Sequence, residues 1–325
     1  MNWAIIGTSF ISDVMAEAIK GDEGSQLYAV SGRSKENLRA FSQKHHPQKT
    51  YSDYQDLIQD PDVDMVYIAL PNHLHHECII KAAEAGKAIL CEKSLSIDME
   101  KTKQSLEAVN KHNVFFAEGL MYLCHPLIEH ALEVLRAGTI GDIKHVQASY
   151  VADIAQFVNP SSKGALYNLG CYPMSLTYLV LAQFLTPQEL MNFEVSAFGT
   201  RGEDGNICES SASFCFSGKV NAQLHSAETY GLKHGFTVLG SKGSLTFKTN
   251  PWLPNEQNAL DVEIYESSHE SINVQADGDA FFYQVRAVRQ AFERGETSLA
   301  SPRATHQLSE GVMKLLTEWE RVTKA

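Results

Sequence analysis

The chain has 325 residues, of which 44% are hydrophobic and 20% charged, and its formal net charge is −12. A chain of this length exceeds what one hydrophobic core usually fills, so we expect two domains. The negative charge and the lack of a Lys/Arg run argue against a nucleic-acid partner, and no apolar run approaches the ~20 residues that cross a membrane.

The six cysteines show neither a CxxC pair nor zinc-ligand spacing. Four of them lie in apolar stretches, so we expect reduced, structural thiols and a reducing compartment. The N-terminus lacks the basic region and cleavage site of a secretory signal. We therefore expect a cytoplasmic protein.

The first 120 residues alternate short apolar runs with helical segments. The runs begin with WAIIG and end with NVFFAE, and apolar residues recur at helical intervals in 11–20, 35–44, 73–85 and 97–112. Near-continuous apolar strands indicate a sheet that is covered on both faces. We therefore predict an α/β domain over residues 1–120 with a doubly wound parallel sheet, the architecture of Rossmann-type dinucleotide-binding domains.

The pattern changes after residue 120. PLIEHALEVLRAG and residues 168–184 predict helices, and Thr186 with Glu189 predicts a capping box that starts another turn. Alternating apolar and polar runs come next, separated by tight turns, as in antiparallel strands. We predict that residues 121–325 form an α+β domain with a large, mostly antiparallel sheet, which binds the substrate.

Two helices close the chain, over 279–294 and 302–323, the second with Ser301 as N-cap and Pro302 in its first turn. An apolar stripe on the last helix must dock, and the first domain is one candidate surface for it; the stripe consists of Leu308, Val312, Leu315, Trp319 and Val322. Because helices cover only one face of the second sheet, we expect a homodimer, or a larger homo-oligomer, through its other face.

The joint GTSFIS, residues 7–12, connects the first strand to the first helix. It retains Gly7 of the G-x-G-x-x-G fingerprint and has Ser9 and Ser12 where the other glycines belong. The N–H groups and dipole of the helix start attract an anion without any need for glycine. By itself the joint fits a plain turn equally well. The residues expected at the pyrophosphate are Gly7, Thr8, Ser9, Phe10 and Ile11.

The second strand ends in VSGRSK, which has no acidic residue for the ribose hydroxyls of NAD. It offers Ser31, Arg33 and Ser34 instead, and an arginine suits a 2′-phosphate. This favours NADP over NAD, although a solvated loop would also carry such residues.

Residues 67–96, YIALPNHLHHECIIKAAEAGKAILCEKSLS, place Glu92 and Lys93 at the carboxyl end of a strand, where open α/β sheets bind ligands. This stretch closely resembles the signature of the glucose-fructose oxidoreductase / inositol dehydrogenase / MocA family, PN-x-x-H followed by GK-x-(x)-CEKP. The resemblance spans the chain, through EGLMYLCHP and ALYNLGCYP to GDAFFYQVRAVRQAFERG.

The resemblance implies a nicotinamide-dependent oxidoreductase with a Rossmann domain and a C-terminal domain that often dimerises through its sheet. By position, Glu92 would hold the ribose and Lys93 would be the catalytic lysine. Asn72 and His75 would lie along the nicotinamide half of the cofactor, and Leu70 and Pro71 would also bind the cofactor.

A later family motif, D-x-G-x-H, is similar to Asn168-Leu169-Gly170-Cys171-Tyr172. Tyrosine in the histidine position resembles the glucose-fructose oxidoreductase and dihydrodiol dehydrogenase branches, nearest the latter, which favour NADP. A phenol with an ordinary pKa near ~10 is a poor base, but a lysine cation stabilises its phenolate. We therefore expect Lys93 and Tyr172 to form an acid/base pair, with Tyr122, His125 and Asn168 on the substrate side.

The chain departs from the family pattern at three positions. Ser94 replaces proline, and since a cis bond before a non-proline costs roughly 2.5 to 4 kcal/mol, we expect a trans Lys93–Ser94 bond. Asn168 replaces the usual acid, so it can bind a hydroxyl but cannot ionise. Leu123 replaces an arginine that many relatives carry, which excludes recognition of a sugar acid or phosphate through that arginine.

Two other interpretations concern single residues. His73, His75 and His76 do not share one helix face and have no carboxylate-rich surroundings, so we expect no metal site. Tyr172 would also fit a core position with a satisfied hydroxyl, and only its combination with Lys93 favours catalysis.

We conclude that the sequence favours an NAD(P)-dependent oxidoreductase that acts on a sugar, polyol or vicinal diol. One alternative is a glycosidase that uses NAD for transient oxidation, against which the lack of an acid near residue 31 counts. Another is a non-catalytic, cofactor-sensing regulator, against which Lys93 and Tyr172 count. The sequence determines neither the substrate nor the reaction direction.

Overall fold

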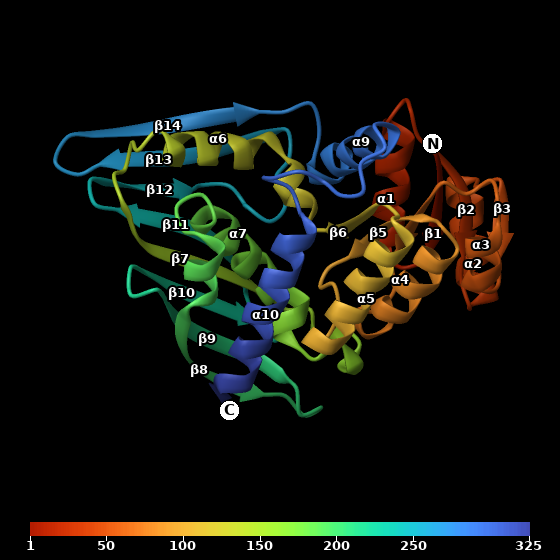
Figure 1. Cartoon of the computed structure of the whole chain (residues 1–325), viewed down its shortest axis with the longest axis horizontal. Coiled ribbons are helices and arrows are strands. Elements are labelled where there is room, and N and C mark those ends of the chain that lie inside the picture. The colour runs from red at the N-terminus through yellow and green to blue at the C-terminus, as the bar shows by residue number, and fades with distance from the viewer. The chain divides into compact units, whose positions relative to one another are not determined.

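The computed structural model describes residues 1–325, and the chain forms two compact units. The first consists of Met1–Met121 and Phe281–His306, the second of Tyr122–Ala280 and Gln307–Ala325. One unit contains a parallel sheet and the other a largely antiparallel sheet, which confirms the predicted fold class (Figure 1). None of the helices combines the length and the apolar character that a bilayer crossing requires.

The first unit has a six-stranded parallel sheet in the order β3-β2-β1-β4-β5-β6. Its strands are β1 Asn2–Ile6, β2 Gln26–Ser31, β3 Lys49–Tyr51, β4 Met65–Ile68, β5 Ala88–Glu92 and β6 Phe116–Gly119. The residues of β1, β4 and β5 are almost all buried, as expected for central strands with helices on both faces. The strand order reverses between β1 and β4, and ligands bind at the carboxyl ends of strands at such a switch point.

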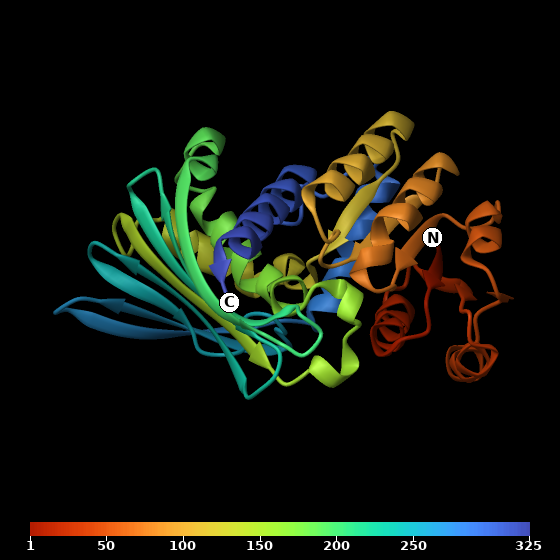
Figure 2. The same ribbon diagram turned by 90° about the horizontal axis from the view of Figure 1, so that it is seen from below.

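Helices pack on both faces of this sheet (Figure 2). They are α1 Phe10–Gly21, α2 Lys35–His45, α3 Tyr54–Gln59, α4 His75–Glu84, α5 Met99–His112 and α9 Ala280–Glu293, with a 3₁₀ turn at Asn72–Leu74. An ion pair ties α9 to the end of α1, since Arg289 Nε lies 2.6 Å from Asp22 Oδ2. This contact explains why a segment far along the chain belongs to the first unit.

The second unit has a nine-stranded sheet in the order β14-β13-β12-β11-β7-β10-β9-β8-β15. The strands are β7 Ile143–Ala152, β8 Phe193–Arg201, β9 Ile207–Phe216, β10 Val220–Ala227, β11 Leu232–Gly240, β12 Gly243–Phe247, β13 Gln257–Ile264, β14 Ser268–Gln275 and β15 Thr323–Lys324. Only the pairs β7–β10 and β8–β15 are parallel. The burial alternates along β10, as in a sheet that is covered on one face.

Helices cover one face of this sheet and leave the other without any helix (Figures 1 and 2). The helices are α6 Pro126–Arg136, α7 Cys171–Leu181, α8 Pro187–Met191 and α10 His306–Val322, with 3₁₀ turns at Met121–Cys124, Ala155–Phe157 and Pro160–Ser162 and a π-helical turn at Leu166–Gly170. The predicted capping box of Thr186 and Glu189 is confirmed. The buried face of α10 contains Leu308, Val312, Leu315 and Trp319 of the predicted stripe.

The predicted start of the last helix is wrong. Ser301 and Pro302 lie in a turn, and α10 begins only at His306. The Arg303 N–H donates to the carbonyl oxygen of Ala300 over 3.1 Å, so the chain reverses before the helix can form. The six cysteines are free thiols, as predicted.

Candidate dinucleotide and substrate sites

Gly7 forms the turn between β1 and α1 with a backbone that requires glycine. Its φ is +114°, and a Cβ atom there would lie 2.8 Å from the carbonyl oxygen of Ala69. The Gly7 N–H donates to the carbonyl oxygen of Ser31 over 2.9 Å, which joins the turn to the end of β2. The one glycine that the joint retains is therefore the one whose position admits no side chain.

Serine at position 12 has a structural use at the start of α1. The Ser9 N–H donates to Ser12 Oγ over 3.2 Å, and the two hydroxyl oxygens are 3.3 Å apart. Ser12 thus satisfies one donor of the helix start, while the N–H groups of Phe10 and Ile11 precede the intrahelical hydrogen bonds. The first turn retains donors and a dipole for an anion.

A cavity of about 840 Å³ opens at the carboxyl ends of β1, β2 and β4. This volume lies within the ~300 to 1,000 Å³ of typical ligand sites. The predicted residues that line it are Gly7, Thr8, Ser9, Ser31, Arg33, Ser34, Leu70 and Pro71. Sequence reasoning missed a second group of lining residues, namely Asn37, Ser52, Asp53, Tyr54 and Gln55. Of these, Asp53 could have been identified from the sequence, because aspartate is a preferred N-cap residue. It caps α3 by accepting a hydrogen bond from the Gln55 N–H over 2.9 Å.

The side chain of Arg33 contributes a positive charge to the lining of this cavity. Arg33 is exposed and lines the cavity, and Ser34 caps α2 by accepting from the Asn37 N–H over 3.3 Å. Together with the Gly7 turn and the first-turn donors of α1, these residues suit the phosphates of a dinucleotide. The donor set of the cavity therefore fits such a cofactor.

The other predicted cofactor residues lie outside the cavity lining. Phe10 is 81% exposed at the start of α1, and Ile11 is half-buried beside it. Asn72, His75, Glu92 and Lys93 lie at or after the ends of β4 and β5. Their contribution to cofactor binding stays a prediction.

His75 bridges two segments of main chain. Its ring is buried, with Nδ1 2.9 Å from the Ser94 carbonyl oxygen and Nε2 2.7 Å from that of Leu70. Burial lowers the pKa of His75 to about 4, although the two carbonyl contacts favour the protonated ring. The neutral ring donates to one carbonyl at a time. His75 thus connects the chain after β4 to the peptide that follows Lys93.

Glu92 is buried at the end of β5. Its Oε1 accepts a hydrogen bond from the Tyr67 hydroxyl over 2.5 Å, and its Oε2 lies 3.3 Å from the Lys93 N–H. Burial raises the pKa of Glu92, against the opposing effect of the Lys93 charge. The predicted ribose ligand is thus also a hydrogen-bonding partner within the first unit.

The expectation of a trans Lys93–Ser94 bond is wrong, because this bond is cis. The surrounding hydrogen bonds explain how serine occupies the position: the Ser94 carbonyl contacts His75, and the Leu95 N–H donates to Glu118 Oε1 over 2.9 Å. Ser94 is completely buried. Tertiary contacts therefore determine the isomer that the local sequence disfavours.

Tyr172 lies in the first turn of α7 within an aromatic cluster of the second unit. Its ring centroid is 5.2 Å from that of Tyr150, 5.8 Å from Tyr122 and 6.2 Å from Trp252. The Tyr122 hydroxyl lies 2.7 Å from Ser175 Oγ and donates to the Tyr172 carbonyl over 3.3 Å. Tyr122 thus supports the start of α7 and orients the backbone that carries Tyr172.

His125 is the N-cap of α6. Its Nδ1 accepts from the Leu127 N–H over 3.1 Å, and its Nε2 lies 3.3 Å from the Gly278 carbonyl oxygen. Burial lowers the pKa of His125, in agreement with an Nδ1 that accepts a hydrogen bond. His125 therefore has a structural role as the cap of α6, independently of any contact with a substrate.

Asn168 forms a buried pair that sequence reasoning missed. Its Nδ2 donates to Oε2 of Glu228 over 2.7 Å. Burial raises the pKa of Glu228, which follows the end of β10. No local sequence motif identifies the Glu228 carboxyl group, because its partner Asn168 is distant in the sequence.

Two family models match the chain. "Oxidoreductase family, NAD-binding Rossmann fold" matches residues 1–120, and "GFO/IDH/MocA C-terminal domain" matches residues 128–246. An uncharacterized oxidoreductase of Rhizobium meliloti is 30% identical over 260 residues, which are 78% of this chain and 76% of that protein. The chain belongs to the GFO/IDH/MocA family. It is therefore an NAD(P)-dependent oxidoreductase, and the resemblance predicted from the sequence motifs is confirmed.

Two further proteins with named activities resemble this chain. Trans-1,2-dihydrobenzene-1,2-diol dehydrogenase of Xenopus laevis is 28% identical over 302 residues, covering 90% of this chain and 89% of that protein. A 3-ketoreductase from Actinomadura kijaniata, solved with NADP and TDP-benzene, has a TM-score of 0.89 at 23% identity and covers 100% of this chain and 98% of its own. This structural likeness supports the assigned fold.

Proposed function

We propose that the chain transfers a hydride between NADP(H) and a CH–OH or carbonyl carbon of a sugar, polyol or vicinal diol. The observation that carries this proposal is the cavity at the switch point, where the Gly7 turn, the first-turn donors of α1 and Arg33 suit a phosphorylated dinucleotide. The names of two relatives, a dihydrodiol dehydrogenase and a 3-ketoreductase, refer to the alcohol form and the carbonyl form of such a carbon. Residues 1–120 would bind the dinucleotide, and residues 121–325 would bind the substrate.

Lys93 and Tyr172 are the proposed acid/base pair. The Tyr172 phenolate takes the proton of the substrate hydroxyl in oxidation, and the resulting Tyr172 hydroxyl returns that proton in reduction, while the Lys93 cation stabilises the phenolate. A bound nicotinamide supplies or accepts the hydride. The solved forms of the related ketoreductase include one with a lysine changed to alanine and one with a tyrosine changed to phenylalanine.

The proposal is tested on the purified chain with and without NADP⁺ and NAD⁺. A dinucleotide present at 100 times its Kd stabilises a protein by about 2.7 kcal/mol, so NADP⁺ is expected to raise Tm clearly. Turnover is then measured with trans-1,2-dihydrobenzene-1,2-diol, aldoses and ketoses. No Tm response to either dinucleotide would refute the cofactor assignment. Release of a sugar from an added glycoside, without net oxidation or reduction of the dinucleotide, would indicate the glycosidase chemistry instead.

Arg33→Ala is expected to raise the KM for NADP⁺ about tenfold and to change that for NAD⁺ little, because the lost guanidinium pairs only with a 2′-phosphate. Steady-state kinetics with both cofactors measures this. Arg39→Ala is the matched control, since Arg39 is exposed on α2 and does not line the cavity. An equal loss with both cofactors would contradict a 2′-phosphate contact.

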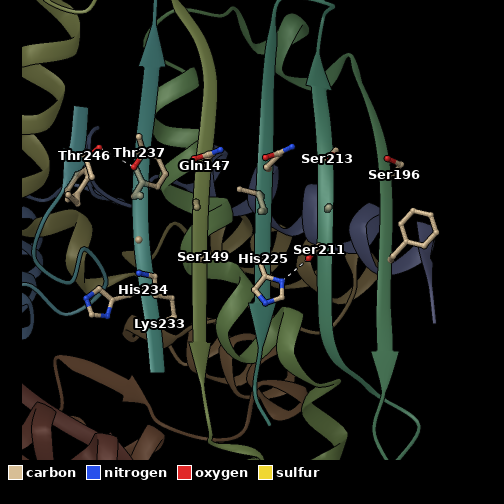
Figure 3. A pocket seen from close by; sticks show the side chains of 18 residues that line it. Gln147, Ser149, Ser196, Ser211, Ser213, His225, Lys233, His234, Thr237 and Thr246 are labelled. Atoms are coloured by element: carbon tan, nitrogen blue, oxygen red, sulfur yellow. Dashed lines mark hydrogen bonds between the residues drawn. The ribbon is translucent and has the colours of Figure 1, made fainter. Parts of the chain in front are cut away.

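A homodimer through the open face of the nine-stranded sheet is also proposed. This face carries rows of short polar side chains, among them Gln147, Ser149 and Ser213, around a hollow of about 650 Å³ (Figure 3). Phe198, on β8, borders the hollow and is 66% exposed, which favours a covering partner. A second copy would bury this face as a two-fold interface.

Phe198→Glu is expected to dissociate the dimer, since a two-fold interface would bury one added charge from each copy. Sedimentation equilibrium should give twice 36.0 kDa for the wild type and the monomer mass for the variant. A wild-type monomer at micromolar concentration would refute the interface. Phe184→Glu, at another exposed aromatic position, is the control.

A further inference from the structure

A carboxyl–amide pair lies one helical turn before Tyr172. The pair joins Asn168 to Glu228, whose surfaces are 9% and 4% exposed. Asn168 and Tyr172 are four positions apart on one continuous helical segment, a π-helical turn over Leu166–Gly170 followed by α7. Side chains four positions apart lie on nearly the same helix face, and π-helical turns often occur at functional sites. The pair therefore adjoins the residue to which the proposed function assigns proton transfer.

The main chain holds Glu228 on both sides. Its N–H donates to the Cys208 carbonyl over 3.0 Å, and its carbonyl accepts from the Ile154 and Ala155 N–H groups, each over 2.9 Å. These bonds fix the backbone at the end of β10. The Glu228 side chain therefore starts from a rigid position.

The helical segment that carries Asn168 is held equally firmly against the sheet. Ser226 Oγ donates to the Ala165 carbonyl over 3.0 Å. Gly164 has a φ of +77°, and a Cβ there would lie 2.4 Å from the Ile207 carbonyl oxygen. The distance between Asn168 and Glu228 is thus set by packing on both sides of the pair.

The bond to Glu228 determines which end of the amide Asn168 presents. An ionised carboxylate only accepts, so the amide NH₂ group faces Glu228 and the carbonyl oxygen Oδ1 points away from it. An amide oxygen has two acceptor sites, so it can accept a hydrogen bond from a substrate hydroxyl in addition to one from another donor. Asn168 therefore presents an acceptor.

We propose that Glu228 is a positioning residue for substrate specificity, which holds Asn168 so that its Oδ1 accepts a hydrogen bond from a second hydroxyl of the substrate. The inference rests on the proposed function, because that hydroxyl neighbours the one on which Tyr172 acts. It narrows the substrate class to vicinal diols and polyols over simple alcohols.

Glu228→Gln is the primary test, with NADP⁺ as cofactor and trans-1,2-dihydrobenzene-1,2-diol and D-xylose as probes. Glutamine can bond to either end of the Asn168 amide, so the amide is no longer held in one orientation. We expect KM for the probe to rise about tenfold and kcat to stay within about twofold, because Tyr172 is intact. Glu270→Gln, at an exposed position on β14, is the control.

The pH dependence separates this role from a structural one. Burial raises the pKa of Glu228, the hydrogen bond from Asn168 opposes this effect, and the charge of Asp204 on the β8–β9 turn raises the pKa further. The Cys208 thiol on β9 also interacts with Glu228. Below that pKa the protonated carboxyl can donate to Oδ1 and reverse the amide. The wild-type KM is therefore expected to rise as the pH falls through this pKa, and the KM of Glu228→Gln is expected to be independent of pH there.

The double variant Asn168→Asp with Glu228→Gln keeps the pair and restores an acceptor, so its KM is expected to return to within about threefold of the wild type. It also serves where Glu228→Gln alone fails to fold. An active wild type with an unchanged KM in Glu228→Gln, or a folded double variant without recovery, would overturn the inference alone. A wild type inactive on every probe would overturn the proposed function and this inference with it.

Discussion

Tyr172→Phe is expected to lower kcat by about 10²- to 10⁴-fold, the usual contribution of a positioned general acid or base. The substitution removes only the hydroxyl, and the ring keeps its contacts with Tyr150 and Trp252. Stability should change little, and NADP⁺ should raise Tm as in the wild type. Stopped-flow measurement of NADPH formation, together with melting curves, checks both expectations.

Tyr178→Phe is the matched control, because Tyr178 lies on the same helix, is equally buried and is not in the aromatic cluster of Tyr172. It should keep wild-type turnover. Lys93→Met should lower kcat as well and move the ascending limb of the pH–rate profile for oxidation to higher pH, since the proposed pair would lose the cation that favours the phenolate. Full turnover of Tyr172→Phe on any substrate would refute the acid/base assignment.

The alternation of buried strands and helices in the first unit was predictable because each central strand is apolar on both faces. The short elements β3 and α3 were not predicted, since the three residues of β3 are polar or half-exposed and α3 has one and a half turns. The loop between them and the first residues of α3 nevertheless supply Ser52–Gln55 to the cavity. The helix predicted over 168–184 consists of a π-helical turn followed by α7. The two differ only in the spacing of their backbone hydrogen bonds, which the periodicity of the side chains does not reveal.

The site residues divide in the same way. The Gly7–Ser9 turn and the Ser31–Ser34 loop come directly after their strands, so their sequence places them at the carboxyl edge. Glu228 bonds to Asn168 across 60 positions of chain, and although a local motif identifies Asn168, no local motif identifies Glu228. The isomer of the Lys93–Ser94 bond likewise depends on partners at His75 and Glu118. Local motifs thus identify the residues at the end of a strand, whereas tertiary pairs require the structure.

Gly7→Ala is expected to abolish the rise of Tm with NADP⁺. The added Cβ would lie 2.8 Å from the Ala69 backbone carbonyl, and a φ of +114° is strained for alanine. Strain of this kind costs about 1 to 3 kcal/mol, and the clash must also move the turn that directs the first N–H groups of α1. Isothermal titration with NADP⁺ and melting curves measure the two effects separately.

Gly86→Ala is the control for Gly7→Ala, because it introduces the backbone strain of a positive φ without a steric clash at the added Cβ. Gly86 also has a positive φ, +72°, but no atom lies within 4 Å of the position that its Cβ would take. This control should lose some stability and keep its affinity for NADP⁺, because it does not line the cavity. If Gly7→Ala binds NADP⁺ as tightly as Gly86→Ala does, the pyrophosphate does not lie on the turn at residues 7–12. A single glycine would suffice for the proposed site because the other two positions of the fingerprint carry serines, and Ser12 accepts a hydrogen bond from the N–H of Ser9 at the start of the helix that we propose binds the anion.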